Sequence, residues 1–341
     1  MAVSGRRFNV AVVGATGVVG SEFFRVLAQR RFPIAQLSAL ASGRSAGRAV
    51  EFEGSQLEVR ELDQSSFDGI DLALFSAGAE ISRTFAPVAA AAGALVVDNS
   101  SAFRLDPGVP LVVPEVNPED IPTHQGIIAN PNCCAIPLSV ALHPLQRRAG
   151  LERVVVATYQ AASGAGAALV EELAEQTRAL AAGDHPAVHA YPHQLAHNVV
   201  PGGWPMEEGG YNEEEMKLVL ETRKILHQAD LRVVATCVRV PVPIAHGEAV
   251  FLETASPLGA AEARREWEAA PGVVVLDDPR AQVYPTPQNV AGRDEVFVGR
   301  IRDDLSNPGG IAFWLVSDNL RKGAALNAVQ IAEEAIRLGV L

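Results

Sequence analysis

Residues 9–20 read Asn-Val-Ala-Val-Val-Gly-Ala-Thr-Gly-Val-Val-Gly, so a β-branched run leads directly into Gly14, Gly17 and Gly20. Residues 21–29 continue with helical spacing. Glycines between a strand and a helix allow a tight turn and a close approach to a pyrophosphate, whose charge then lies at the helix N-terminus. The stretch therefore predicts a dinucleotide-binding loop, although its spacing is GxxGxxG and the commoner pattern is GxGxxG.

The residues after this loop indicate which dinucleotide it holds. An NAD site usually carries an acidic residue about 20 positions further on, which binds the ribose hydroxyls. No acidic residue occurs between Glu22 and Glu51, whereas Ser42, Arg44 and Ser45 lie where a 2′-phosphate would be. The sequence thus favours NADP over NAD.

The surrounding pattern predicts an α/β protein with two domains. In the first part, short β-branched runs alternate with Ala-rich helical stretches, which is typical of a parallel sheet. The strands predicted there are 9–13, 36–41, 71–75, 94–98 and 126–129. Beyond Leu151, longer runs separated by acidic helical segments predict a second, α+β domain with strands at 151–159, 232–242, 249–254, 295–302 and 310–316. Residues 318–338 return to helical spacing, stop at Gly339, and are expected to pack onto the first domain.

Composition excludes several classes of protein. The length of 341 residues fits two domains, and 48% hydrophobic with 20% charged residues excludes a disordered or fibrous chain. The net charge of −12 opposes binding to nucleic acids or anionic membranes. The uncharged stretch 121–146 contains four prolines, which argues against a membrane helix. Three cysteines are too few for a disulfide framework, so a cytoplasmic location is expected.

Two of these cysteines stand where a thiol becomes reactive. Asn130-Pro-Asn-Cys133-Cys134 precedes an apolar helical stretch, 135–146. Backbone N–H groups at a helix N-terminus stabilise a thiolate, which makes such a cysteine a better nucleophile at neutral pH. A pair of small buried hydrophobes is the alternative interpretation. The chemistry of the residues alone does not choose between Cys133 and Cys134.

Eight segments, in order along nearly the whole chain, resemble aspartate-semialdehyde dehydrogenase. They are Val-Gly-Ala-Thr-Gly-Val-Val-Gly (13–20), Leu-Ala-Ser-Gly-Arg-Ser-Ala-Gly (40–47), Val-Asp-Asn-Ser-Ser-Ala-Phe-Arg (97–104), Asn-Pro-Asn-Cys (130–133), Tyr-Gln-Ala-Ala-Ser-Gly-Ala-Gly (159–166), Glu-Glu-Met-Lys (214–217), Arg-Val-Pro-Val (239–242) and Asp-Asn-Leu-Arg-Lys-Gly-Ala-Ala (318–325).

This resemblance implies a fold and a reaction. A Rossmann-type, parallel-sheet dinucleotide domain would comprise residues 1–131 and 318–341, with the C-terminal helix completing it, and an α+β catalytic and dimerisation domain would comprise 132–317. The implied protein is a homodimer that reduces L-4-aspartyl phosphate to L-aspartate 4-semialdehyde with NADPH, releasing phosphate, through a thioacyl intermediate on a cysteine. The reaction would serve lysine, threonine, methionine and diaminopimelate biosynthesis.

The resemblance also implies roles for individual residues. Cys133 would be the nucleophile and His246, seven residues after Arg239, the acid–base group. The implied substrate-binding residues are Gln160, Glu214 and Arg239, and the implied phosphate-binding residues are Arg104 and Lys217. The implied cofactor-binding residues are Gly14, Thr16, Gly17, Val18, Val19, Ser42, Arg44, Ser45, Ser163, Gly164 and Asn319. No metal is expected.

The chain departs from the family pattern at two points. It has Ala245-His-Gly-Glu where Gly-His-Ser-Glu is more frequent, and Cys134 where Ser or Thr is commoner. Neither change removes a reacting group. Cys134 adds a second oxidisable thiol, which could form a disulfide with its neighbour and lower activity.

Three other interpretations compete with this one. No Tyr is followed four residues later by Lys, which excludes a short-chain reductase. N-acetyl-glutamyl-phosphate reductase uses the same cysteine chemistry, but the 97–104 segment and the Glu214–Lys217 pair favour aspartyl phosphate. A non-catalytic paralogue is the third possibility, and retention of the reacting residues argues against it.

Histidines recur every fourth residue at His185, His189, His193 and His197, but Pro186 and Pro192 are expected to break the helix that a metal site would need.

Overall fold

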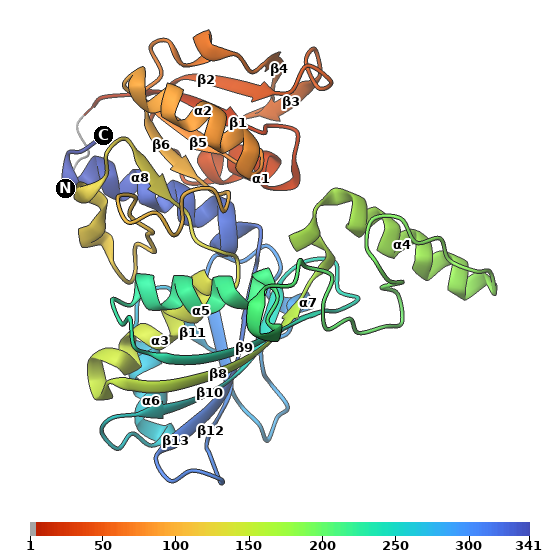
Figure 1. Cartoon of the computed structure of the whole chain (residues 1–341), viewed down its shortest axis with the longest axis vertical. Coiled ribbons are helices and arrows are strands. Elements are labelled where there is room, and N and C mark those ends of the chain that lie inside the picture. The colour runs from red at the N-terminus through yellow and green to blue at the C-terminus, as the bar shows by residue number, and fades with distance from the viewer. Residues whose placement is uncertain (1–4) are drawn as a thin grey trace. The chain divides into compact units, whose positions relative to one another are not determined.

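The computed structural model describes residues 5–341, which form two compact units (Figure 1). The first unit comprises residues 5–132 and Ala324–Leu341, and the second comprises Cys133–Gly323. The chain therefore enters the second unit at Cys133 and leaves it after Gly323.

The first unit is a seven-stranded sheet in the order β3-β4-β2-β1-β5-β6-β7, parallel except that β3 runs antiparallel to β4. Its strands are β1 (Phe8–Val13), β2 (Ile34–Ala41), β3 (Ala49–Phe52), β4 (Ser55–Glu61), β5 (Leu72–Phe75), β6 (Leu95–Asp98) and β7 (Ile127–Ala129). Its α-helices are α1 (Val18–Gln29), α2 (Ala79–Ala91) and α8 (Leu326–Leu338), with short 3-10 turns at Gln64–Phe67 and Pro118–Thr123.

Alternation along β1 explains why helices cover both faces of this sheet. Val10 and Val12 belong to one apolar cluster with residues of α1 and α8, whereas Ala11 and Val13 belong to another with Ala86 and Ala89 of α2. A parallel strand buried on both faces reads as a continuous apolar run, as residues 10–13 of β1 do. The predicted return of the C-terminal helix to the first domain is thereby confirmed.

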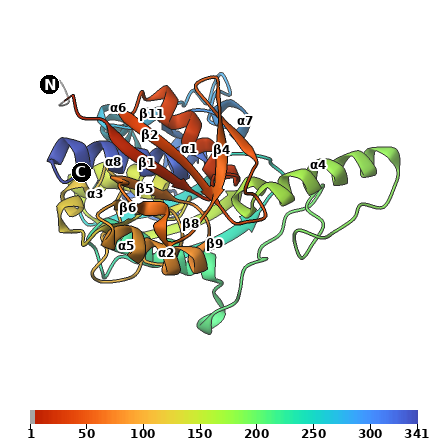
Figure 2. The same cartoon turned by 90° about the horizontal axis from the view of Figure 1, so that it is seen from above.

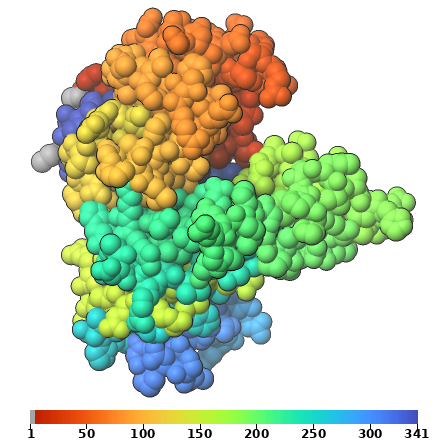
Figure 3. Space-filling view, viewed as in Figure 1, coloured from red at the N-terminus to blue at the C-terminus, as the bar shows by residue number. Residues whose placement is uncertain are grey.

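The second unit is a six-stranded mixed sheet in the order β11-β12-β13-β10-β8-β9. Its strands are β8 (Leu151–Gln160), β9 (Arg232–Arg239), β10 (His246–Thr254), β11 (Val273–Val275), β12 (Val296–Asp303) and β13 (Gly310–Ser317). Its α-helices are α3 (Ala135–Ala149), α4 (Ala167–Ala182), α5 (Glu213–Ile225), α6 (Ala260–Ala269) and α7 (Pro287–Val290), with 3-10 turns at Ala162–Ala165 and Glu208–Gly210. Helices α3, α5 and α6 pack on the sheet, while α4 and the segment after it extend away from it as an arm (Figures 2 and 3).

Most predicted strands exist with small shifts at their ends, and three differences are larger. The strand expected at 232–242 ends at Arg239, because Pro241 and Pro243 have no N–H to continue the ladder. The strand expected at 249–254 begins earlier, at His246. Strands β3, β4 and β11 were not predicted, since their short, charged or isolated runs carry little alternation.

The C-terminal helix begins later than the sequence predicts. The α-helix starts at Leu326, after a π-helical turn at Arg321–Ala325, rather than at Asp318. Asp318 instead accepts hydrogen bonds from the backbone N–H groups of Gly292, Leu320 and Arg321, which fix it in the second unit. The second unit thus extends to Gly323, beyond the boundary at 317 expected from the sequence. The helix does stop at Gly339, which is left-handed with a φ of 73°.

No helix among residues 5–341 is both long and apolar enough to cross a membrane. The uncharged stretch 121–146 is divided among a 3-10 turn, β7 and the first part of α3.

Candidate active site

The candidate active site lies on one face of the second sheet. Because side chains alternate along a strand, His246 and Glu248 of β10 point to the same face. The register pairs Glu248 with Thr158 and Gln160 with Arg239, so these side chains share that face. We call it the inner face; all of these side chains are buried, and Glu214 of α5 lies over it.

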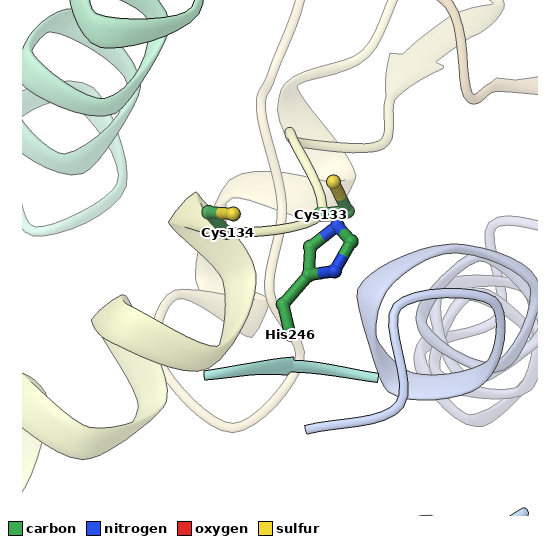
Figure 4. A group of neighbouring side chains, drawn as sticks. All are labelled: Cys133, Cys134 and His246. Atoms are coloured by element: carbon green, nitrogen blue, oxygen red, sulfur yellow. The ribbon is translucent and has the colours of Figure 1, made fainter. Parts of the chain in front are cut away.

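Cys133 reaches this face from the N-terminal end of α3. Its sulfur, the sulfur of Cys134 and a ring nitrogen of His246 lie within 4.8 Å of one another (Figure 4). The Cys134 thiol donates a hydrogen bond that lowers the pKa of Cys133 well below its ordinary value; burial opposes this effect, and the charge interaction with the nearby His246 adds to it. Burial and the same sulfur–sulfur contact raise the pKa of Cys134. The structure therefore distinguishes the two cysteines, because the pKa is lowered at Cys133 and raised at Cys134.

The tautomer of His246 follows from one backbone contact. Nδ1 accepts a hydrogen bond from the Ala161 N–H at 2.9 Å. A backbone N–H can only donate, so Nδ1 carries no proton and the neutral ring carries its proton on Nε2. Nε2 has no hydrogen-bond partner among the described residues and is the ring nitrogen turned toward Cys133 in Figure 4. The imidazole thus presents an N–H to Cys133.

Arg239 is a buried cation that has no acidic partner among residues 5–341. It is 2% exposed, donates from one terminal nitrogen to the Ala161 carbonyl at 2.7 Å, and has an unpaired Nε. Its guanidinium lies over the rings of Trp204 and Tyr191, at 4.8 and 5.6 Å from their centroids. Aromatic faces stabilise a cation without neutralising it, so Arg239 remains available for an anionic ligand.

A chain of polar contacts joins the remaining predicted residues of this unit. Gln160 donates to Glu214 at 3.0 Å and accepts from the Thr158 hydroxyl at 3.0 Å. Lys217 lies 3.5 Å from Glu214 and 2.8 Å from Glu213. The prediction that Glu214 and Lys217 share a helix face is confirmed, since both lie on α5.

Ser163 and Asn319 are brought together in the second unit. The Asn319 side-chain amide donates to the Ser163 hydroxyl at 2.9 Å, and its oxygen accepts from the Ala245 N–H at 2.9 Å. Asn319 thus holds the turn after β8 against the residue that precedes His246. Gly164 lies in the same turn, and a Cβ added to it would be 3.0 Å from Arg239 and 3.1 Å from His246 Nε2. A side chain at this position would occupy the space in front of both groups.

The loop after β1 has the shape that a dinucleotide requires. A Cβ on Gly14, whose φ is +86°, would lie 2.3 Å from the Ser76 carbonyl, and one on Gly20 would lie 2.0 Å from the Gly14 carbonyl. Gly17 is the N-cap residue of α1 and has no side chain, so no side chain accepts a hydrogen bond from the first backbone N–H groups of the helix. Thr16 and Gly17 are exposed, and Val18 and Val19 are partly exposed at the same helix end. These residues fit a bound pyrophosphate.

The residues predicted to bind a 2′-phosphate form the turn after β2. Ser42 and Arg44 are exposed, and the Thr16 hydroxyl lies 3.3 Å from that of Ser45, so this turn adjoins the glycine loop. Sequence reasoning missed Glu61, which ends β4 and pairs with Ala41. Its carboxylate would be 2.6 Å from a Cβ on Gly43.

Arg104 belongs to the first unit. It is 8% exposed and donates to the carbonyls of Asn130 and Asn99 at 3.0 and 2.8 Å. These contacts fix the guanidinium immediately before the Asn-Pro-Asn-Cys segment. They do not neutralise its charge.

Glu248 is a functional candidate that the sequence analysis did not single out. It is fully buried, and neither carboxylate oxygen has a hydrogen-bond partner within residues 5–341. Burial, with a smaller contribution from the nearby Cys133 thiolate, raises the pKa of Glu248 well above its usual range. Its position two residues after His246, on the same face of a strand, was the signal that could have indicated it.

The spaced histidines do not form a helical face. Helix α4 ends at Ala182, and His185, His189, His193 and His197 lie exposed in the irregular segment after it. The predicted break of the helix is confirmed. Tyr191, in the same segment, folds back to contact Arg239, a role that its irregular surroundings gave no reason to expect.

Comparison with known proteins identifies the family. Residues 9–124 match the semialdehyde dehydrogenase NAD binding domain, and residues 142–322 match the semialdehyde dehydrogenase dimerisation domain. Aspartate-semialdehyde dehydrogenase of Synechocystis sp. is 51% identical over 98% of this chain and 98% of its own. The chain belongs to the aspartate-semialdehyde dehydrogenase family. It is an oxidoreductase of that family, which confirms the resemblance noted in the eight segments.

Solved structures of the family agree with the fold. Aspartate semialdehyde dehydrogenase II from Vibrio cholerae, complexed with ASA, superposes with a TM-score of 0.95 at 45% identity, covering 97% of this chain and 99% of that one. The enzyme from Candida albicans, with NADP, superposes with a TM-score of 0.76 at 26% identity over 98% of this chain and 100% of that one. The expected α/β architecture, with a dinucleotide domain and a second sheet domain, is confirmed.

Proposed function

We propose that this member of the aspartate-semialdehyde dehydrogenase family reduces L-4-aspartyl phosphate to L-aspartate 4-semialdehyde with release of phosphate, and that the nucleophile is Cys133. This proposal rests mainly on the cluster at the inner face. There Cys133, whose pKa is lowered, lies beside the imidazole N–H of His246 and near the buried Arg239. A thiolate, an N–H donor and a cation are the groups that acyl transfer from an acyl phosphate requires.

The chain's own residues account for the acyl transfer. The Cys133 thiolate attacks the acyl carbon, the bond to phosphate breaks, and a thioester remains on Cys133. The Nε2–H of His246 donates a hydrogen bond to the acyl oxygen, which gains negative charge during the attack. The ring needs no change of tautomer for this, because Nδ1 is already held unprotonated. When a nicotinamide cofactor is bound, it supplies the hydride that reduces the thioester. The thiohemiacetal then releases the aldehyde and restores the thiolate.

Substrate recognition follows from charge. We assign the α-carboxylate to Arg239, because a planar guanidinium binds a carboxylate through two parallel hydrogen bonds. We assign the α-ammonium to Glu214, with Gln160 holding both Glu214 and the substrate. Arg104 and Lys217 are assigned to the phosphate, because this dianion needs positive charges around it. Arg104 supplies a guanidinium held in place, which can donate two parallel hydrogen bonds, and Lys217 supplies an ammonium group.

The glycine loop would hold the pyrophosphate of the cofactor through Gly14, Thr16, Gly17, Val18 and Val19. The turn after β2 would hold the 2′-phosphate of NADP through Ser42, Arg44 and Ser45. We propose that Ser163, Gly164 and Asn319 border the nicotinamide end. The NADP found with the Candida albicans relative supports this choice of dinucleotide. Residues 5–132 with Ala324–Leu341 then form the cofactor domain, and Cys133–Gly323 the catalytic and dimerisation domain.

The assembly and location form part of the proposal. The match to a dimerisation domain supports a homodimer formed through the second unit. Cys133, Cys134 and Cys237 form no disulfide within residues 5–341, and Cys133 must stay reduced to act, which supports a cytoplasmic enzyme.

The deciding experiment follows the reduction of NADP by the purified protein with L-aspartate 4-semialdehyde, with and without phosphate. We expect turnover that depends on phosphate and none with N-acetyl-glutamate semialdehyde. Turnover of only the acetylated substrate would contradict the assignment of Glu214, because that substrate keeps the α-carboxylate and has no α-ammonium. No turnover of either substrate by folded, reduced protein that binds NADP would contradict the enzymatic role.

A further inference from the structure

The two adjacent cysteines form an arrangement that the reaction does not require. Cys133 is partly exposed and Cys134 fully buried, and their sulfurs lie within 4.8 Å of each other and of a ring nitrogen of His246. Within residues 5–341 this is the one group of three metal-ligating side chains gathered so closely. The proposed chemistry uses only one of the two thiols.

The tautomer of His246 decides what this group can bind. A histidine that ligates a metal almost always donates its other ring N–H to a neighbouring acceptor. Nδ1 of His246 cannot donate here, because the Ala161 N–H already points at it from 2.9 Å. Coordination through Nε2 would move the proton to Nδ1 and set two N–H groups against each other. The group therefore offers two sulfur ligands rather than the three protein ligands of a typical zinc site.

A direct disulfide between the two cysteines is also disfavoured. Consecutive Cα atoms across a trans peptide lie about 3.8 Å apart, whereas disulfides usually span about 4.4–6.8 Å. Cys134 is held in helical geometry at the start of α3, with φ −94° and ψ −36°. A single bridging atom enlarges the ring and relaxes this constraint, so a ligand that bonds to both sulfurs fits where a disulfide is strained.

We propose that Cys133 and Cys134 form a dithiol site for trivalent arsenic, which closes the active site. With a monosubstituted arsenous acid, R–As(OH)₂, the Cys133 thiolate displaces one hydroxide and the Cys134 thiol displaces the second, its proton leaving as water. Two As–O bonds break and two As–S bonds form, while arsenic stays trivalent and no oxidant is needed. The partly exposed Cys133 reacts first, and Cys134 then closes the chelate by rotation about its side-chain bonds.

The test uses phenylarsine oxide and the intact-protein mass rather than turnover. Wild type and Cys237→Ser are expected to gain one phenylarsenic group per chain with loss of two thiol protons. This group should resist excess glutathione and leave with dithiothreitol. In Cys134→Ser and Cys134→Ala the arsenical is held by one sulfur, so release by glutathione should be about 100-fold faster, the loss expected when the second attachment is removed. Digestion should place the arsenic on the peptide that contains Cys133 and Cys134.

Several outcomes would overturn the site. Equal retention in wild type and both Cys134 variants would show that Cys134 takes no part, and arsenic on Cys237 would place the site elsewhere. Wild type alkylated beforehand at Cys133 provides a folded control that should bind no arsenical; retention of the chelate by this form would contradict the proposal. Equally tight binding of one Zn²⁺ that protects both thiols would contradict the choice of ligand. Because the readout is mass, a failed proposal of enzymatic function would leave these results unaffected.

Discussion

Ala245 is held in a left-handed conformation directly before His246. Its φ is 73°, which costs an L residue with a Cβ about 1–2 kcal/mol relative to the right-handed form. The Asn319 contact to its N–H fixes this geometry and so the start of β10. Glycine, more frequent in the family at this position, would adopt it without strain.

We therefore expect Ala245→Gly to raise the free energy of unfolding by about 0.5–1 kcal/mol, measured by urea denaturation. Ala249→Gly, further along the same strand, is the matched control and should destabilise the protein. A loss of stability in both variants would mean that the backbone at Ala245 carries no strain.

The two neighbouring thiols should differ sharply in function. Cys133→Ala is expected to lower turnover by about 10⁴-fold or more, because no nucleophile remains, while Cys134→Ser should keep most of it, since a hydroxyl still donates to the thiolate. Steady-state NADP reduction measures both. Alkylation by iodoacetamide should stay fast to lower pH at Cys133 than at Cys237, because the pKa is lowered at Cys133 and raised at Cys237. The opposite pattern of activities would assign the nucleophile to Cys134.

Glu248 should make stability depend on pH. Its raised pKa means that, once the pH exceeds the ordinary carboxyl pKa of about 4.3, the unfolded chain has lost this proton and the folded chain still binds it. The free energy of unfolding therefore falls with rising pH until the folded-state pKa is passed. Glu248→Gln should remove this fall and be about 1–3 kcal/mol more stable than wild type at pH 8, as judged by denaturation at several pH values.

The exposed Glu58 provides the control for this prediction, since Glu58→Gln should leave the pH dependence of stability unchanged. A Glu248→Gln protein that loses stability in parallel with wild type between pH 5 and 8 would show that the carboxyl is ionised in the fold.

At the level of elements, the turn after β2 should set the choice of dinucleotide. Arg44→Ala is expected to weaken NADP binding by about 10- to 100-fold and to change NAD binding little, because only NADP places a phosphate there. Fluorescence titration with both dinucleotides measures this. Arg48→Ala, exposed on the same connection, is the control. Equal losses for NADP and NAD in the Arg44 variant would remove its assigned role.

The same region shows what the sequence could and could not predict. Long, periodic elements such as β1, α1 and α3 were predictable, because their apolar runs and glycines are continuous in the chain. The place of Glu61 was not, because it depends on β4 lying parallel to β2, a pairing between segments with little alternation. The resemblance implied Cys133 and His246. The Ala161 N–H that sets the tautomer of His246 was not predictable, because a backbone contact has no residue signature.

At the level of the whole molecule, the outer face of the second sheet should carry the dimer contact. Tyr159, Val234 and Phe251, from three neighbouring strands, are each 40% exposed on this face, which is opposite to the inner face. Phe251→Glu is expected to shift the protein to a monomer in light scattering at micromolar concentration, because a charge in an apolar contact is costly. Leu305→Glu, fully exposed in the turn before β13, should leave the dimer intact. A dimeric Phe251→Glu protein would move the contact elsewhere.

The first unit is made of two chain segments that flank the second unit, so during synthesis on the ribosome the second unit is completed before the first. The second unit is complete once Gly323 has been made, whereas the first must wait for α8, whose Val329, Ile331 and Ala332 fill its core. A nascent chain therefore carries a finished second unit while one apolar side of the sheet in its first unit is still uncovered. Any message that ends before α8 should yield a product that chaperones and proteases recognise by that bare surface, so synthesis of the last helix acts as a check on completeness.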